Sequence, residues 1–345
     1  MLKLPGNLSA EKFLAYHWQK KPLYMPRALD NVRPSVTRNE LAWLATLEDV
    51  ESRIVFTDRR GDRKQYRVET GPFDDEYLGA LPLRDWTLLV HDVEKHLPAL
   101  RKLFDHVPFI PDWRIDDLMV SFAAPGGGVG PHRDNYDVFL CQGIGIREWT
   151  CTSAQIAADE AASSDLLLVE EFSGEQKICV EGDVLYLPPG IAHWGTAQRA
   201  CMTYSIGMRA PQYYGDPDLE LSEVVPGYIS KAALDRAGEQ TTELGRTVTE
   251  VKEWLRPEPP DEGAVKQLLE KPSRKLELHG MARVAYDDDH VYVNGKHRKV
   301  TEKERAAVAE LCARRSLDST RLVALSPDLV SWLASKGAFE IPEIT

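Results

Sequence analysis

Residues 118–139 read LMVSFAAPGGGVGPHRDNYDVF, and residues 182–195 read GDVLYLPPGIAHWG. Both stretches alternate short runs of Val, Leu, Phe and Tyr with Gly and Pro. The same pattern recurs in DVFLCQGIG (137–145), REWTCT (147–152), KICV (177–180) and MTYSIGM (202–208). Short strands joined by tight turns are typical of an antiparallel barrel or sandwich. The middle of the chain is therefore predicted to be a β-rich domain.

Helices are predicted on the N-terminal side of this domain. Ser9 precedes an amphipathic run that ends at Lys20-Lys21-Pro22, and a second helix is expected from Asn39 to about Leu47. Apolar residues recur at helical spacing between 86 and 103, which predicts a third helix. Helices are thus expected to dominate the first hundred residues.

The C-terminal side has a different pattern. Residues 219–255 are mostly helical in character, and the run PEPPDEG at 257–263 predicts a linker. The strand pair ARVAY (282–286) and HVYVNG (290–295), with helices expected at 302–313 and 328–336, resembles a small winged helix. Residues 276–345 contain ten Lys or Arg and eleven Asp or Glu, which favours a packing or protein-contact module over a DNA reader. The predicted divisions are 1–212, 213–270 and 271–345.

Composition narrows the possible functions. The 345 residues are enough for two or three domains. Forty-two Lys and Arg against fifty-four Asp and Glu give a net charge of -12, which argues against direct nucleic-acid binding and favours a cationic or neutral partner. The five cysteines include no C-x-x-C pair, so reduced core thiols are expected. No signal-peptide pattern or long apolar run is present, which predicts a cytoplasmic protein without membrane contact.

His132-Arg133-Asp134 is the only H-x-[DE] triplet among the nine histidines. In a strand both side chains project from the same face and can chelate one ion. His193 follows another strand and a tight turn, so two histidines and one carboxylate are expected to converge. This set is typical of non-haem Fe(II) oxygenases, which keep three coordination positions open, but zinc also accepts it.

Arg147 begins the strand that follows the H-x-D strand. An arginine that points into a barrel needs an anionic partner, because a buried unpaired charge is costly. A dicarboxylate co-substrate would supply that partner, with the guanidinium binding one carboxylate. The alternative is an exposed arginine on an edge strand.

Six stretches together resemble the bacterial ribosomal oxygenases of the JmjC (cupin-like) family, within which the match is greatest to the branch that hydroxylates an arginine of the sixteenth protein of the large ribosomal subunit. They are HWQKKPL (17–23), DWRIDDLMVSF (112–122), PGGGVGPHRDNYDVF (125–139), QGIGIREW (142–149), GDVLYLPPGIAHWG (182–195) and MTYSIGMRAP (202–211). The resemblance spans essentially the whole chain and is densest from Asp112 to Pro211.

The resemblance implies an α+β, mainly β fold: a double-stranded β-helix with N-terminal helices, a helical dimerisation segment and a C-terminal winged-helix-like domain. It implies a homodimer that uses Fe(II), 2-oxoglutarate and O2 to hydroxylate the β-carbon of an arginine in that ribosomal protein. The implied residues are His132, Asp134 and His193 for iron, Arg147 and Ser121 for 2-oxoglutarate, and Asp117, Met119 and Tyr136 for the substrate arginine.

Several alternatives remain open. The chain could be another JmjC protein hydroxylase or a demethylase, or a zinc or manganese cupin that acts as an isomerase or hydrolase. A non-catalytic adaptor would place the function after Leu276. Asp116 and Asp117 could form a general acid/base pair, although adjacent strand residues face opposite ways. His91 and His96 fall on a predicted helix and are expected to be structural.

Overall fold

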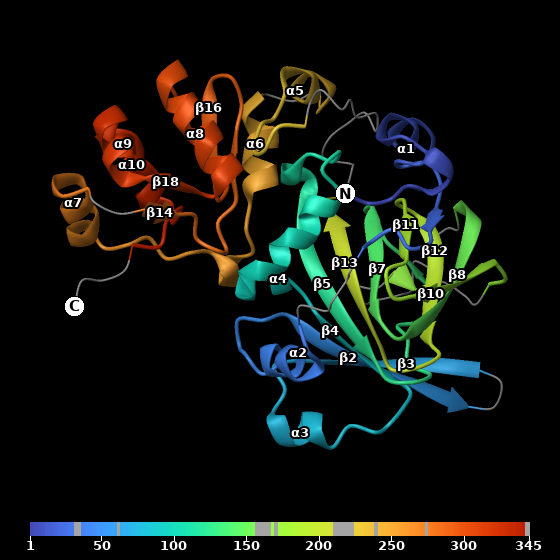
Figure 1. Cartoon of the computed structure of the whole chain (residues 1–345). Helices are drawn as coiled ribbons and strands as arrows, with labels where there is room; N and C mark the ends of the chain where they lie inside the picture. Colours follow the sequence, from blue (N-terminus) through green and yellow to red (C-terminus); the bar gives the residue numbers. More distant parts are fainter. Residues whose placement is uncertain are drawn as a thin grey trace. The chain divides into compact units, whose positions relative to one another are not determined.

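The computed structural model describes residues 1–30, 36–60, 63–155, 167–168, 172–209, 224–237, 241–272 and 275–341. The chain forms two compact units, one from residues 1–108 and 115–210 and the other from residues 109–114 and 211–345 (Figure 1). No helix in the described ranges is long and apolar enough to cross a membrane.

The first unit is built on two antiparallel sheets. The larger has the strand order β1-β11-β7-β13-β5-β4-β2-β3 and the smaller the order β10-β8-β12-β6-β9. The bounds are β1 Leu23–Met25, β2 Ser52–Arg60, β3 Arg63–Thr70, β4 Trp86–Val90, β5 Ile115–Ala123, β6 His132–Arg133, β7 Val138–Ile144, β8 Ile146–Gln155, β9 Leu167–Leu168, β10 Glu175–Val180, β11 Val184–Leu187, β12 Ile191–Ala197 and β13 Cys201–Met208.

The core of this unit lies between the two sheets. One cluster joins residues of β7 and β11 in the larger sheet to residues of β8 and β10 in the smaller: Val138, Leu140, Leu185 and Leu187 with Trp149, Cys151 and Cys179. Every residue of β13 is buried, as expected for a central strand. The five cysteines are all buried and free, which confirms the prediction of core thiols. The strands predicted from residue 118 to residue 208 and the double-stranded β-helix core are confirmed.

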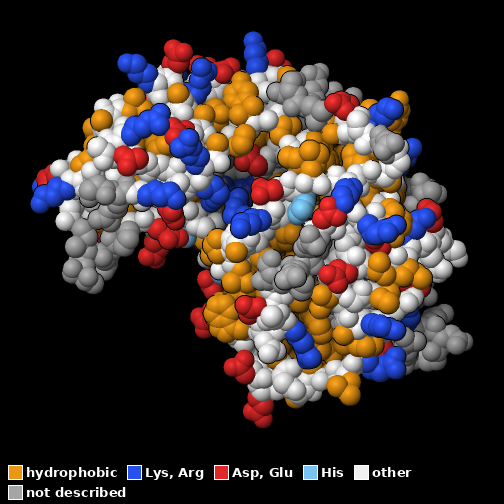
Figure 2. Space-filling view, in the orientation of Figure 1, with side chains coloured by type: hydrophobic (Ala, Val, Ile, Leu, Met, Phe, Trp, Pro, Cys, Tyr) orange, Lys and Arg blue, Asp and Glu red, His pale blue; other side chains and the backbone are white. Residues whose placement is uncertain are grey.

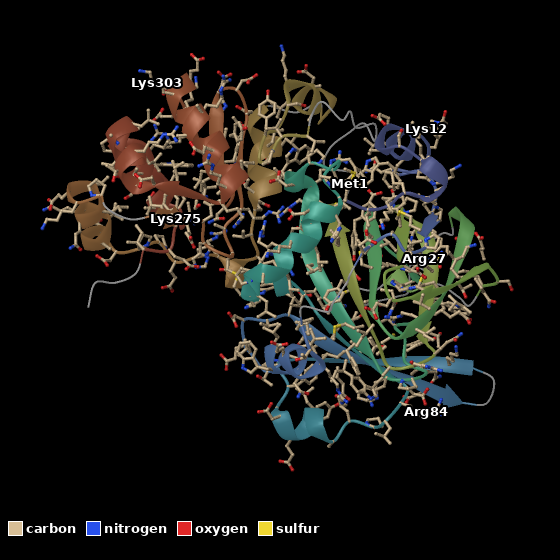
Figure 3. All side chains as sticks on the ribbon, viewed as in Figure 1. Met1, Lys12, Arg27, Arg84, Lys275 and Lys303 are labelled. Carbon is tan, nitrogen blue, oxygen red and sulfur yellow. The ribbon has the colours of Figure 1, made fainter. Side chains whose placement is uncertain are left out.

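Short helices flank the sheets: η1 Pro5–Asn7, α1 Ala10–Tyr16, α2 Arg38–Leu44, α3 Asp75–Gly79, α4 Val93–His96 and η2 Pro98–His106. Ser9 caps α1 by accepting from the backbone N–H of Lys12. Thr37 and Glu40 form a capping box at the start of α2. The exposed Lys12 lies on the solvent face of α1 (Figure 3). The first two predicted helices are confirmed.

The predicted helix over 86–103 is wrong in its first part. Residues 86–90 are the strand β4, which lies between β2 and β5 and is buried at every position. A strand covered on both faces is largely apolar, and a short apolar run of this kind also fits a helix. The strands β2, β3 and β4 also overturn the expectation that helices dominate the first hundred residues.

The second unit contains η3 Asp112–Arg114, α5 Lys231–Ala237, α6 Thr241–Thr249, η6 Glu253–Leu255, α7 Glu262–Glu270, β14 Lys275–Glu277, β15 Val284–Tyr286, β16 His290–Val293, β17 Lys296–Lys299, α8 Glu302–Arg314, β18 Ser316–Asp318, α9 Ser319–Leu325 and α10 Pro327–Ser335. The antiparallel sheet β15-β16-β17 and the helices α8 and α10 confirm the winged-helix-like prediction. The exposed Lys303 marks the solvent face of α8 (Figure 3).

The helices α5 and α6 pack on this winged-helix part. Leu234 of α5 and Leu244 and Val248 of α6 are buried in one cluster with Trp113 and Tyr292. These apolar positions of the predicted helical segment are therefore buried within the chain. Part of the predicted segment, residues 213–223, lies outside the described residues.

Candidate active site

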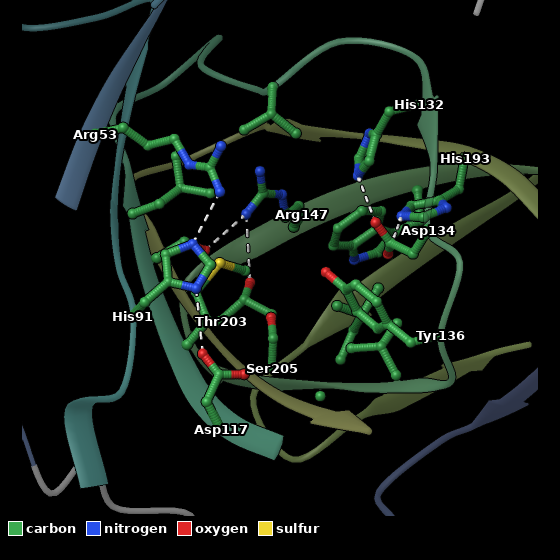
Figure 4. A pocket seen from close by; sticks show the side chains of 18 residues that line it. Arg53, His91, Asp117, His132, Asp134, Tyr136, Arg147, His193, Thr203 and Ser205 are labelled. Carbon is green, nitrogen blue, oxygen red and sulfur yellow. Dashed lines mark hydrogen bonds and ion pairs between the residues drawn. The ribbon is translucent and has the colours of Figure 1, made fainter. Parts of the chain in front are cut away.

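Two histidines face each other across neighbouring strands of the smaller sheet. His132 begins β6 and His193 lies in β12, and the two are direct partners in the antiparallel pairing. Their ring centroids lie 4.3 Å apart. Asp134 follows β6, with carboxylate oxygens 4.0 Å from Nε2 of His132 and 3.7 Å from Nε2 of His193. The three side chains therefore point toward a common centre (Figure 4).

Backbone carbonyls determine which nitrogen of each ring faces that centre. Nδ1 of His132 lies 2.9 Å from the carbonyl oxygen of Gly130, and Nδ1 of His193 lies 3.0 Å from that of Ile191. A carbonyl only accepts, so each Nδ1 carries the proton and each Nε2 keeps its lone pair.

The protonation state of His193 suits a metal ligand. Burial, and then the charge of the neighbouring His132, lowers the pKa of His193 to about 4, so its imidazole is neutral near neutral pH. Two imidazole Nε2 atoms and a carboxylate are a donor set that fits Fe(II) or Zn(II). His132, Asp134 and His193 could therefore hold a divalent metal.

Arg147 is a buried cation near this cluster. It is 2% exposed, and its Nη1 lies 3.3 Å from Oγ of Ser121 and 3.5 Å from Oγ1 of Thr203. Thr203 donates its own proton to Gln142 at 3.2 Å, which leaves its oxygen free to accept from Arg147. Among the described residues, none accepts a hydrogen bond from Nε of Arg147. Burial lowers the pKa of this guanidinium. An anionic ligand would therefore offset the free-energy cost of burying a positive charge without a counter-charge.

A glycine provides the space for the Arg147 side chain. A Cβ atom on Gly195 would lie 2.5 Å from Nε of Arg147 and 2.8 Å from the ring of Trp149. The guanidinium carbon lies 4.8 Å from the Trp149 ring centroid, and the His193 ring lies 5.9 Å from it. Trp149 therefore contacts both Arg147, which is predicted to bind the co-substrate, and His193, which is a predicted metal ligand.

The side chains predicted to bind the metal, the co-substrate and the substrate arginine all line one pocket (Figure 4). They share it with residues from β2, β4, β7, β8 and β13, with His91 just after β4, and with Val129 between β5 and β6. The full lining is Arg53, Leu89, His91, Asp117, Met119, Ser121, Val129, His132, Asp134, Tyr136, Val138, Leu140, Arg147, Trp149, His193, Thr203, Ser205 and Gly207.

The pairing of β5 with β13 arranges part of this lining in rows. Ser121 pairs with Thr203, Met119 with Ser205, and Asp117 with Gly207. Residues two apart on a strand share a face and are separated by roughly 6.8 Å. The rows therefore lead from the cationic end at Arg147 to an acidic end at Asp117.

The acidic end holds the three residues predicted to bind the substrate. Asp117 and Met119 come from β5, and Tyr136 comes from the loop before β7. The negative charge of Asp134, followed by burial, raises the pKa of Tyr136, so its hydroxyl remains a donor. Asp116 faces elsewhere and pairs with Arg209 at 3.3 Å, so Asp116 and Asp117 do not form an acid/base pair.

The pocket residues that were not predicted as part of the site include Arg53, His91, Trp149, Ser205 and Gly207. His91 was expected to be structural, but it follows the strand β4 and lies in the pocket. Arg53 belongs to β2, which was not predicted. Trp149 and Ser205 lie on predicted strands, where the period-two pattern could have placed them on the inner face with Arg147 and Thr203.

Two parts of the chain match known families. Residues 102–215 match the JmjC domain, and residues 241–335 match the ROXA-like winged helix. The first range includes all five residues predicted to bind the metal or the co-substrate. The second agrees with the winged-helix-like prediction.

Curated relatives cover most of the chain. It is 34% identical to the ribosomal protein uL16 3-hydroxylase of Escherichia coli over 348 residues, with 90% of each chain covered. It is 36% identical over 235 residues to a probable ribosomal oxygenase of Haemophilus influenzae, with 64% of this chain and 57% of that protein covered.

Solved structures agree with these relatives. A crystal structure of the Escherichia coli ribosomal oxygenase YcfD matches with a TM-score of 0.73 and 29% identity, covering 99% of both chains. A structure of YcfD in complex with cobalt and 2-oxoglutarate matches with a TM-score of 0.70 and 31% identity, also covering 99% of both chains.

Proposed function

The chain belongs to the JmjC family of ribosomal oxygenases, and from this premise we propose that it hydroxylates the β-carbon of an arginine side chain in the large-subunit ribosomal protein uL16. The observation that carries the proposal is one pocket with an unpaired buried cation at one end, a carboxylate at the other, and the His-Asp-His cluster on its wall. A dicarboxylate and a guanidinium are complementary to those two ends.

Each co-substrate has candidate binding residues. His132, Asp134 and His193 would hold Fe(II), and Arg147 would bind the distal carboxylate of 2-oxoglutarate with support from Ser121. When bound, Fe(II) with 2-oxoglutarate and O2 supplies the oxidation of a C–H bond. The protein contributes by orienting the two co-substrates and by excluding water from a site whose histidines are nearly fully buried.

The substrate arginine would occupy the opposite end. Asp117 would accept from its guanidinium, while Met119 and the ring of Tyr136 would pack against its aliphatic stem. Anchoring the charged tip at Asp117 directs the inner carbons of the side chain back toward the metal ligands. This arrangement favours oxidation of a carbon close to the backbone.

The net charge suits a basic substrate. A charge of -12 attracts a cationic ribosomal protein and disfavours docking on RNA, so we propose action on free uL16 in the cytoplasm, before assembly. Acidic and basic side chains are both spread over the visible face of the C-terminal unit, which does not resemble a nucleic-acid surface (Figure 2). The winged helix is then a protein-contact module.

We also propose a homodimer, on the family resemblance and on exposed apolar side chains of the helical segment. Trp254 is 57% exposed and Val225 is 43% exposed. Sizing chromatography with light scattering, applied to the full chain and to Trp254→Glu, tests this surface. A wild-type monomer would contradict it.

Replacement of Asp134 tests the proposed chemistry. Asp134→Ala removes the carboxylate that both histidines face, so we expect it to abolish metal binding and 2-oxoglutarate turnover while the fold survives. Asp116→Ala is the matched control, because it removes a neighbouring carboxylate that pairs with Arg209 outside the pocket. The measurements are metal stoichiometry, succinate formation coupled to oxygen uptake, and circular dichroism.

The same measurements separate the alternatives. A zinc or manganese isomerase or hydrolase would show no oxygen uptake, and a demethylase would release formaldehyde from a methylated peptide. Retained 2-oxoglutarate turnover in Asp134→Ala would contradict the proposed metal site.

A further inference from the structure

Asp117 ends a chain of three side chains that reaches across the larger sheet. Nη2 of Arg53 lies 2.9 Å from Nε2 of His91, and Nδ1 of His91 lies 3.2 Å from Oδ2 of Asp117 (Figure 4). Arg53 comes from β2, His91 follows β4, and Asp117 lies on β5. All three line the pocket, and none of them is part of the metal cluster.

The chemistry of arginine fixes the direction of these hydrogen bonds. A guanidinium has donors and no acceptor, so Nε2 of His91 must accept from Arg53. In the neutral ring the proton then sits on Nδ1, which donates to the carboxylate of Asp117. Arg53 therefore selects the tautomer of His91 that can hold Asp117.

One oxygen of Asp117 is held in this way and the other is left toward the pocket. Oδ2 accepts from His91 and also lies 3.4 Å from the backbone N–H of Asp92. Oδ1 faces Gly207, where an added Cβ would lie only 2.9 Å from it and 4.0 Å from the Tyr136 ring. The missing side chain at Gly207 leaves room for a ligand group next to Oδ1.

The backbone supports this arrangement. Arg53 pairs with Leu89 between β2 and β4, and the backbone N–H of His91 donates to the carbonyl of Glu51 at 2.9 Å. The two side chains are thus presented by paired backbone rather than by a free loop. The hydrogen bond between His91 and Asp117 is also shielded from solvent, since these two side chains are only 15% and 16% exposed.

We infer that Arg53 and His91 are positioning residues that hold Asp117 with one oxygen directed at the substrate guanidinium, and so set the preference for arginine over a neutral side chain of the same shape. This inference rests on the proposed function. Both residues act through Asp117.

The test compares three replacements of His91. His91→Asn places an amide N–H near the position of Nδ1, His91→Gln reaches toward Arg53 instead, and His91→Ala removes both contacts. The substrates are a uL16 peptide with the target arginine and the same peptide with citrulline, which has the same shape and no charge. Arg53→Met tests the outer contact, and Arg67→Met, on the neighbouring strand β3 outside the pocket, is its control.

We expect His91→Ala and His91→Gln to raise the KM for the arginine peptide about tenfold and to remove most of the preference over citrulline, as expected for a lost hydrogen bond to a charged group. His91→Asn should recover most of the loss, and Arg53→Met should give a smaller rise. The KM for 2-oxoglutarate should not change in any of them. Equal effects of Asn and Ala at position 91, or a shift confined to the KM for 2-oxoglutarate, would overturn the inference.

A structural measurement keeps this test independent of the proposed reaction. If the wild-type protein oxidises neither peptide, the proposed function fails, and crystal structures still decide the positioning role. We expect the Asp117 carboxylate to rotate in His91→Ala and to keep its orientation in His91→Asn. An unmoved carboxylate in His91→Ala would overturn the positioning role.

Discussion

At the scale of the residue, Arg147 shows most clearly what the pocket can bind. The sequence placed it at the start of a strand and required an anionic partner, but an exposed position was equally consistent. Burial decides this point, because the guanidinium is 2% exposed and the acceptors that it has among the described residues are two hydroxyl oxygens, with no carboxylate. The H-x-D motif and the turn before His193 could be recognised from the sequence, because each involves only residues close together along the chain.

Replacement of Gly195 tests the fit around Arg147. In Gly195→Ala the new methyl group would meet Nε of Arg147 at 2.5 Å, so the guanidinium must move. We expect the KM for 2-oxoglutarate to rise about tenfold, in the same direction as for Arg147→Met, with little change in the KM for the peptide.

Gly79→Ala is the matched control, because a Cβ at this position has no atom within 4 Å. Steady-state kinetics in both co-substrates measures the effect. Unchanged co-substrate kinetics in Gly195→Ala would return Arg147 to a purely structural role.

At the scale of the element, β4 explains why part of the site was missed. Its sequence, WTLLV, is buried at every position and apolar at four of the five, because both of its faces are covered. Such a run has no period that separates strand from helix. Arg53 and His91 enter the pocket only through the pairing of β2 with β4 and of β4 with β5. Register between distant segments cannot be read from local patterns.

Glu94, in the short helix α4, should make the free energy of unfolding depend on pH. Glu94 is 1% exposed and accepts from the backbone N–H of Leu118 at 2.9 Å. Burial raises its pKa to about 7, against 4.5 for the free side chain. Between these pH values the folded state holds a proton that the unfolded state has released, so stability falls as pH rises through this window.

Replacement of Glu94 should remove this dependence. Glu94→Gln keeps an oxygen acceptor for Leu118 and carries no charge. We expect it to be more stable than the wild type by on the order of 1–3 kcal/mol at pH 8, and by little at pH 5. Urea unfolding at both pH values measures the difference, with the exposed Glu76→Gln as control. The same difference at both pH values would contradict the pKa of Glu94.

At the scale of the whole molecule, the two family matches agree with the β-rich domain and the winged-helix-like domain that sequence patterns predicted. The change of period near residue 118 and the strand pairs after residue 282 were sufficient to recognise a β-rich domain and a winged-helix-like domain. The packing of α5 and α6 on Trp113 was not predictable, because Trp113 lies more than a hundred residues before them in the sequence. The net charge of -12 acquires a role only once a basic substrate is proposed.

The most direct test of the proposed activity is the mass of uL16 from cells with and without this gene. Peptide mass spectrometry should find one added oxygen atom on a single arginine in cells with the gene. That oxygen should be absent from cells without the gene and from cells that carry only the Asp134→Ala form. An identical uL16 mass in all three strains would contradict the assignment as an arginine hydroxylase of this protein.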